Sequence, residues 1–507
     1  MLKPNSNKSL SQVLSFWFEN FSDAFNAVKV GKITAVNTSN QTVDVQILSK
    51  KVKQDTMTER VLRDYPVLLS VPFVVLGGGG SLSGAAFVSS PLQVKSGAKA
   101  VLNTVDRVTY SNNITGNGQI TVYGSAVPGS GWYATRTPLR LNMKSFGGTL
   151  VAQAVHSDDG RFTLDTANGS DSLTLNIPSG IIVQNTAKTL RIGQLTGNGS
   201  LGGYCSFAND GSSGINTWQV GNDEDFTFNG GVVASDRFVK MGKGTMTVGA
   251  TSMWTSSGAV TIEEGEIKIL TNGVSGKLGS LGTGVLTVAA GAKLSGFTTT
   301  STATAEKTPM TNSSYVINGT INPSNLSSIF GNSIANMGGK NVTINSGGSL
   351  EVMARIVSRT ARAAACLTNV GKMTMNDGAT LSLTFSSTYN PATYVTSEDK
   401  SENFTVFQAT SSSIGKIVYN LPDLSQYSDN LYYDYSNISN GVLAIRYREI
   451  AVKGDVNGDG IVNGTDIQAV INFIIASEYD EKADVNEDGV VNGTDIQEII
   501  NIIVSTD

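Results

Sequence analysis

Two twelve-residue loops near the C-terminus, 455–466 and 484–495, carry side-chain oxygens at matching positions. Extended to 455–475 and 484–504, the two copies align without gaps and are identical at 15 of 21 positions. Oxygens at loop positions 1, 3, 5, 9 and 12 and the backbone carbonyl at position 7 can converge on a hard cation, and glycine at position 6 permits the sharp turn. The pattern predicts two calcium ions, with Asp455, Asn457, Asp459, Ile461, Asn463 and Asp466 as the first ligand set and Asp484, Asn486, Asp488, Val490, Asn492 and Asp495 as the second.

A short amphipathic helix is expected directly after each loop. The apolar residues follow the spacing i, i+3, i+4, i+7, i+8, which places them on one helix face. They are Ile467, Val470, Ile471, Ile474 and Ile475 in the first copy and Ile496, Ile499, Ile500, Ile503 and Val504 in the second. The two helices are therefore predicted to pack face to face. Neither loop is preceded by a convincing helix, so the unit is half of a helix–loop–helix calcium hand.

Residues 451–507 resemble a type I dockerin, the calcium-dependent module that binds cohesin domains in cellulose-degrading assemblies. The resemblance implies a cohesin-like partner and places the contact at the helix starts, which here are Gly464, Thr465, Gly493 and Thr494. Members from those assemblies usually carry a Ser-Thr pair there and a basic residue further along the helix, where this chain has Asn472 and Asn501. Two hypotheses remain: calcium only holds the module folded, or it also prepares it for docking.

Catalytic constellations are scarce in the rest of the chain. His156 is the only histidine, which argues against histidine-dependent triads and multi-histidine zinc sites. The adjacent carboxylates Asp158-Asp159 and Glu263-Glu264 would face opposite sides of a strand, so neither pair suits acid/base work on one bond. No catalytic residue is predicted. Cys205 and Cys366 lie far apart and are interpreted as two separate buried thiols, with a disulfide as the alternative.

A short phrase recurs between about residues 88 and 447: apolar, polar, apolar, two turn residues, then glycine. Alternate side chains of a strand point to one face, and a turn ending in glycine lets the chain bend toward the next strand. Repetition of this unit stacks strands into a solenoid with one continuous core. We expect a right-handed parallel β-helix, with a β-sandwich as the alternative. The copies are Leu92–Gly97, Leu175–Gly180, Val260–Gly265, Leu286–Gly291, Val342–Gly347 and Met373–Gly378.

The same body resembles the passenger-associated strand repeats of autotransporters and their Bacteroidetes relatives. The resemblance is carried by residues 192–201, 239–248 and 251–269, and by the closing stretch 403–447. Most such proteins are displayed or secreted scaffolds, so it implies an extracellular or cell-surface scaffold or adhesin, with a surface glycan as one partner. The alternative is a β-helix enzyme that degrades polysaccharides, or an accessory subunit of one.

The N-terminal part contains different signals. Apolar residues between Leu10 and Val28 recur at helical spacing, which predicts an amphipathic helix within residues 1–28. Alternation over 31–36 and 43–47 predicts a hairpin, and 65–76 a further strand. Residues 29–80 resemble the N-terminal OB-type domain of phage baseplate central spike proteins. That resemblance implies a virion component, and then a trimer, as an alternative function.

Composition limits the partners and the location. The net charge is −5 and no run of Lys or Arg could follow a phosphate backbone, which argues against nucleic acid. No apolar run is long enough to span a bilayer. The stretch from Leu10 to Val28 is interrupted by Glu19, Asn20 and Asp23, so no signal peptide is expected in this chain although the predicted location is extracellular. The expected fold is mainly β, with a small α-helical calcium module at the C-terminus.

Overall fold

The computed structural model describes residues 31–37, 42–47, 51–56, 59–63 and 68–72 of the N-terminal part. From residue 92 to residue 506 it describes the chain except at 105–107, 125–136, 155–160, 165–168, 186–188, 205–214, 250–252, 271–279, 297–309, 324–333, 357–361 and 365. The helix expected within residues 1–28 lies outside these residues.

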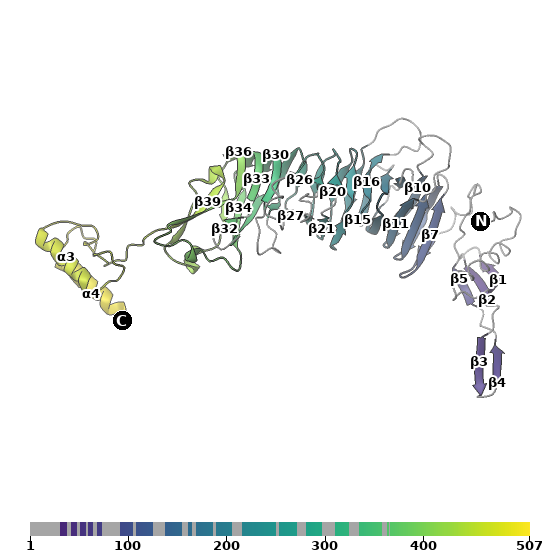
Figure 1. Cartoon of the computed structure of the whole chain (residues 1–507), viewed down its shortest axis with the longest axis horizontal. Coiled ribbons are helices and arrows are strands. Elements are labelled where there is room, and N and C mark those ends of the chain that lie inside the picture. The colour runs from purple at the N-terminus through teal and green to yellow at the C-terminus, as the bar shows by residue number, and fades with distance from the viewer. Residues whose placement is uncertain are drawn as a thin grey trace.

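Parallel β-sheets dominate the body, where successive strands stack as rungs along its length (Figure 1). The largest sheet has thirteen strands in the order β36 (Phe407–Ile414), β33 (Cys366–Met375), β30 (Ile334–Ile344), β28 (Ser314–Ile317), β26 (Leu286–Val288), β23 (Val260–Ile262), β20 (Arg237–Lys240), β17 (Thr217–Val220), β15 (Thr189–Gly197), β13 (Ser170–Ile177), β11 (Thr149–Ala154), β9 (Gln119–Gly124) and β7 (Lys99–Thr104).

Two shorter parallel sheets and one two-stranded sheet form the other faces. The first has seven strands, β19 (Gly231–Val233), β16 (Ser200–Tyr204), β14 (Ile182–Asn185), β12 (Arg161–Leu164), β10 (Thr137–Phe146), β8 (Val108–Gly116) and β6 (Leu92–Val94). The second runs through β18 (Phe226–Phe228), β21 (Thr245–Val248), β24 (Glu266–Ile269), β27 (Lys293–Gly296), β29 (Thr320–Asn322), β31 (Ser349–Ile356), β34 (Thr380–Phe385) and β37 (Val418–Asn420), with β32 (Arg362–Ala364) antiparallel to β31. The pair is β22 (Met253–Trp254) and β25 (Ser280–Leu281).

The recurring strand–turn–glycine pattern forms the turn that connects two faces of one rung. Its six glycines all have positive φ, between 65° and 82°, at Gly97, Gly180, Gly265, Gly291, Gly347 and Gly378. At Gly265, between β23 and β24, a Cβ would lie 2.5 Å from the carbonyl oxygen of Gly242 in the rung below. Only glycine satisfies both the left-handed backbone and this close approach. The predicted parallel solenoid is confirmed, and a sandwich is wrong for these sheets because the ladders between successive rungs are parallel. The right-handed sense stays a prediction.

Equivalent positions of successive rungs lie above one another and form the core. One column of directly paired residues includes Val220, Lys240, Ile262, Val288 and Ile317. The four aliphatic members are fully buried, and so is Lys240. The Nζ of Lys240 donates to the carbonyl oxygens of Met241 at 2.9 Å and Gly242 at 2.8 Å, so the column accommodates a cation by surrounding it with backbone acceptors.

The last rungs lead into a different type of sheet, the C-terminal cap. Strands β35 (Ser401–Thr405), β39 (Val442–Tyr447) and β38 (Leu431–Asp434) pair antiparallel in that order. Short 3₁₀ helices η2 (Pro391–Thr393), η3 (Leu424–Gln426) and η4 (Ile438–Asn440) lie in the connections. Buried Phe404, Leu431 and Leu443 join the cap to the solenoid core.

The predicted N-terminal hairpin is confirmed as the antiparallel pair β1 (Gly31–Asn37) and β2 (Thr42–Ile47). The strand expected at 65–76 is the shorter β5 (Leu68–Pro72), which pairs with β2 and ends at a proline that cannot donate a ladder hydrogen bond. A second hairpin, β3 (Lys51–Thr56) with β4 (Glu59–Arg63), was not predicted, because its residues are mostly polar and show little apolar alternation. These five strands form two sheets separate from the solenoid sheets.

Two helices follow the cap, α3 (Gly464–Ala476) and α4 (Gly493–Thr506), and each begins within the last three positions of one of the acidic loops. Among the helices of the described residues, none is long and apolar enough to cross a membrane.

Candidate metal centre

The first acidic side chain of each loop organises the turn that follows it. The Oδ1 atom of Asp455 accepts the backbone N–H groups of Gly458 and Asp459 at 2.9 and 3.1 Å, and its Oδ2 atom accepts that of Gly460 at 2.8 Å. Asp484 accepts from Asp488 and Gly489 in the same way, at 3.0 and 2.8 Å. These hydrogen bonds to a carboxylate bend each loop around its position 1.

The last acidic side chain closes each loop and caps the next helix. Asp466 is fully buried, and its two oxygens accept the N–H groups of Asn457 at 3.1 Å and Asn463 at 2.9 Å. Asn463 in turn accepts the N–H of Thr465, and its reciprocal bonds with Asp466 form a capping box at the start of α3. Asp495 is also fully buried and holds Asn486 and Asn492 by the equivalent bonds. Loop closure and helix initiation thus depend on the same carboxylate.

The remaining predicted ligands lie inside the same small loop. The Nδ2 atom of Asn457 donates to Asp459 at 3.0 Å and to the hydroxyl of Thr465 at 2.7 Å. The amide of Asn463 lies 3.3 Å from the carbonyl oxygen of Ile461. The second loop repeats these contacts, with Asn486 bonded to Asp488 and Thr494, and Asn492 bonded to the carbonyl of Val490. Thr465 and Thr494, predicted to contact a partner, are exposed, yet their hydroxyls bond within the loops.

Two features of the second loop were not predicted. The hydroxyl of Tyr479 donates to the Oδ2 atom of Asp484 at 3.0 Å, and this hydrogen bond raises the pKa of Tyr479. Position 4 is Gly458 in the first loop but Glu487 in the second, and both have positive φ, 76° and 59°. A side chain in that conformation costs on the order of 1 kcal/mol. The glycine in the first copy is the sequence signal that could have revealed the left-handed backbone at Glu487.

The predicted packing of the two helices against each other is confirmed, but over a narrower seam than the predicted stripes. Val470 and Ile499 are fully buried at its centre, with Val456 and Val485 from the loops beside them. The outer members of the predicted stripes are exposed instead: Ile475 at 77%, Val504 at 70% and Ile500 at 38%. Two helices cover only a narrow seam of each other, so a stripe as wide as i to i+8 leaves its edge in solvent.

The donor set fits calcium in its chemistry. Each loop offers three carboxylates, two amide oxygens and one backbone carbonyl, all hard oxygen donors within twelve residues. Over the described part of the chain, no group of three or more His, Cys, Asp or Glu side chains is gathered closely enough to hold a metal. The predicted convergence of three aspartates is therefore not found in either loop, since Asp455 and Asp466 direct their oxygens to backbone N–H groups. A site here needs the amide and carbonyl oxygens as well.

Other residues considered for chemistry do not assemble into a site. Glu263 and Glu264 are exposed in the turn between β23 and β24, and not on a strand as predicted. Cys366 is buried in β33. His156, Asp158, Asp159 and Cys205 lie outside the described residues.

Comparison with known proteins agrees with the geometry of the C-terminal loops. Residues 453–504 match the family model of the dockerin type I domain, which identifies this segment as such a domain. A comparison of the chain with curated proteins finds no match. The resemblances of the solenoid to autotransporter passenger repeats and of residues 29–80 to phage spike proteins stay predictions.

Proposed function

We propose that the chain is a non-catalytic extracellular or cell-surface scaffold whose dockerin type I domain binds two calcium ions and docks to a cohesin-type partner. The observation that carries this proposal is the duplication: two loops with the same oxygen donors and the same internal hydrogen bonds, inside a segment that matches the dockerin family. The solenoid is then the cargo that docking holds in place.

Asp455, Asn457, Asp459, Asn463, Asp466 and the carbonyl of Ile461 would hold the first ion, and Asp484, Asn486, Asp488, Asn492, Asp495 and the carbonyl of Val490 the second. Bound calcium supplies positive charge that offsets the repulsion among the carboxylates of each loop. The chain itself prepares the site, because Asp466 and Asp495 already fix the loop ends and the helix starts. Because the same two carboxylates would also bind calcium, calcium binding is coupled to the order of α3 and α4.

The proposed docking surface consists of the two helix starts. Gly464, Thr465, Gly493 and Thr494 are all exposed. Exposed Ile475 and Val504 add apolar area further along the helices. Because the two copies are nearly identical, a partner that fits one helix start also fits the other, and the module can bind in two orientations. This symmetry supports docking over a purely stabilising role of calcium.

The test is capture of the full chain by immobilised type I cohesin domains in calcium and in EGTA. We expect capture only in calcium, with two ions bound per chain by calorimetry. Thr465→Arg or Thr494→Arg alone should weaken capture little, since the other orientation remains, while the double variant should abolish it. Because the two hydroxyls also bond to Asn463 and Asn492, calorimetry of each variant measures its calcium binding beside its capture. Glu478→Gln, at an exposed residue outside the loops, is the control. A calcium stoichiometry near zero, or capture that the double variant does not change, refutes the proposal.

A further inference from the structure

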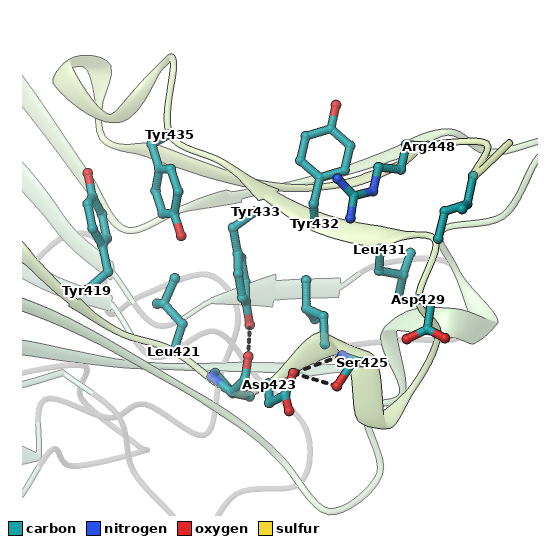
Figure 2. A pocket seen from close by; sticks show the side chains of 13 residues that line it. Tyr419, Leu421, Asp423, Ser425, Asp429, Leu431, Tyr432, Tyr433, Tyr435 and Arg448 are labelled. Carbon is teal, nitrogen blue, oxygen red and sulfur yellow. Dashed lines mark hydrogen bonds between the residues drawn. The ribbon is translucent and has the colours of Figure 1, made fainter. Parts of the chain in front are cut away.

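A pocket of about 500 Å³ opens in the C-terminal cap, between β37, η3, β38 and the chain that leaves β39 (Figure 2). Its volume lies within the ~300–1,000 Å³ typical of small-molecule sites. The pocket shares no residue with the acidic loops. Its walls combine aromatic rings with a few charged groups.

The aromatic wall consists of tyrosines. The rings of Tyr419 and Tyr435 have centroids 4.2 Å apart and are tilted by 42°, and those of Tyr433 and Tyr435 are 6.4 Å apart and tilted by 32°. Figure 2 shows these three side chains side by side along the pocket. The hydroxyl of Tyr433 donates to the carbonyl oxygen of Pro422 at 3.0 Å, which fixes its ring, while Tyr435 is 39% exposed. The wall therefore presents a fixed aromatic surface with an exposed ring at its edge.

The polar wall carries two carboxylates and one guanidinium, those of Asp423, Asp429 and Arg448. Asp423 accepts the N–H and the hydroxyl of Ser425 through Oδ1, at 3.0 and 2.8 Å, and these bonds leave Oδ2 unused. Asp429 is exposed and forms no hydrogen bond or ion pair with another described residue. The guanidinium of Arg448 lies 5.8 Å from the ring centre of Tyr432. The pocket thus offers acceptors and donors beside its aromatic wall.

We propose that this pocket binds a neutral oligosaccharide. A sugar ring has one face of C–H groups, which pack on the electron-rich face of a tyrosine, and a rim of hydroxyls, which need both acceptors and donors. Tyr419 and Tyr435 supply the aromatic face for the C–H groups. Asp423, Asp429 and Arg448 supply the acceptors and donors for the hydroxyls. Two carboxylates against one guanidinium disfavour an acidic sugar, because its carboxylate would meet net negative charge.

The inference rests on the scaffold role proposed above and names the class of ligand that the scaffold would hold. It does not depend on calcium, because none of the pocket residues belongs to the acidic loops. If the chain docks in calcium but binds no sugar, only the proposal that this pocket binds an oligosaccharide is refuted. Loss of docking with intact sugar binding would refute only the docking proposal.

The experiment is calorimetric titration of the full chain with cellohexaose, xylohexaose and mannohexaose, and with hexagalacturonate and a proline-rich dodecapeptide for comparison. At least one neutral hexasaccharide should bind more tightly than the two comparison ligands. Tyr435→Ala and Asp429→Ala should each weaken that binding about tenfold, since each removes one contact worth about that factor. Tyr435→Phe keeps the ring and should retain binding. Ile215→Ala, at a 53% exposed residue of the solenoid, is the matched control.

Three results would overturn the inference. The first is that none of the neutral hexasaccharides binds. The second is that hexagalacturonate or the peptide binds more tightly than they do. The third is that Tyr435→Ala and Asp429→Ala both leave binding unchanged while their unfolding midpoints match that of the unmodified chain.

Discussion

Replacing Asp466 by asparagine tests whether one carboxylate both closes the first loop and starts α3. Asparagine has the same size, but its amide nitrogen would face the N–H group of either Asn457 or Asn463, which Asp466 now accepts at 3.1 and 2.9 Å. A buried hydrogen bond to a charged group is worth about 1.5–3 kcal/mol, so we expect a loss of about 2 kcal/mol without metal. With calcium at a hundred times its Kd, loss of the site removes a further ~2.7 kcal/mol.

Amide hydrogen exchange of the full chain, followed by mass spectrometry, measures this loss in place. In EGTA, peptides from 464–476 should exchange about 30-fold faster in Asp466→Asn, because every 1.4 kcal/mol of local opening free energy is a factor of ten. In calcium the opening free energy of this segment should be about 5 kcal/mol lower in the variant than in the unmodified chain. Glu478→Gln removes the same charge at an exposed residue outside the loops and is the matched control.

An increase of less than threefold in EGTA would refute the role of Asp466 in closing the loop. An equal increase in Glu478→Gln would show that the lost charge matters and the two hydrogen bonds do not. If Asp466→Asn speeds exchange in EGTA but the difference from the unmodified chain is no larger in calcium, Asp466 closes the loop without binding the metal. The proposed set of calcium ligands is then wrong.

Three more outcomes follow from the structure. Adding EGTA to the full chain should speed amide exchange in α3 and α4 and leave β23, β26 and β30 unchanged, because the solenoid core contains none of the loop oxygens. Phe238→Ala should lower the free energy of unfolding of the solenoid by about 3–5 kcal/mol in urea titrations, because Phe238 is fully buried with its ring centre 4.6 Å from that of Trp254. Val418→Ala, at a 53% exposed residue, should change it by less than about 0.5 kcal/mol. Burial lowers the pKa of Lys240 to about 8. The unfolded chain, with a lysine pKa of about 10.4, binds more protons than the folded chain between these values, so stability should rise with pH across that window by at most about 3 kcal/mol. Urea midpoints from pH 7 to pH 10.5 check this, and Lys240→Met should remove the rise attributable to this lysine.

Local patterns of the sequence were sufficient for the repeating parts of the molecule. The strand–turn–glycine phrase predicts the rungs because alternation and left-handed glycine are properties of a few neighbouring residues. The acidic loops and the start of each following helix were predicted for the same reason, since the ligands and caps of a loop lie within twelve residues. The hairpin of β1 and β2 also rests on neighbours in sequence.

Contacts between distant residues were decided only by the tertiary structure. The stacking of Lys240 between Val220 and Ile262 depends on which rungs are neighbours, and nothing near Lys240 in the sequence indicates a buried cation. The exposure of Ile475 and Val504 depends on how much of each helix its partner covers.

The tyrosine pocket shows the same limit at a candidate functional site. Its walls come from β37, η3, β38 and the chain after β39, and neither the strand pattern nor any motif links Tyr419 to Arg448. The sequence by itself determined the rungs, the turns and the oxygen donors, because each depends on backbone conformation and spacing within a short segment. Only the tertiary structure decided which side chains are buried, which remain exposed and which meet across the cap, because burial and long-range contact depend on how whole elements pack.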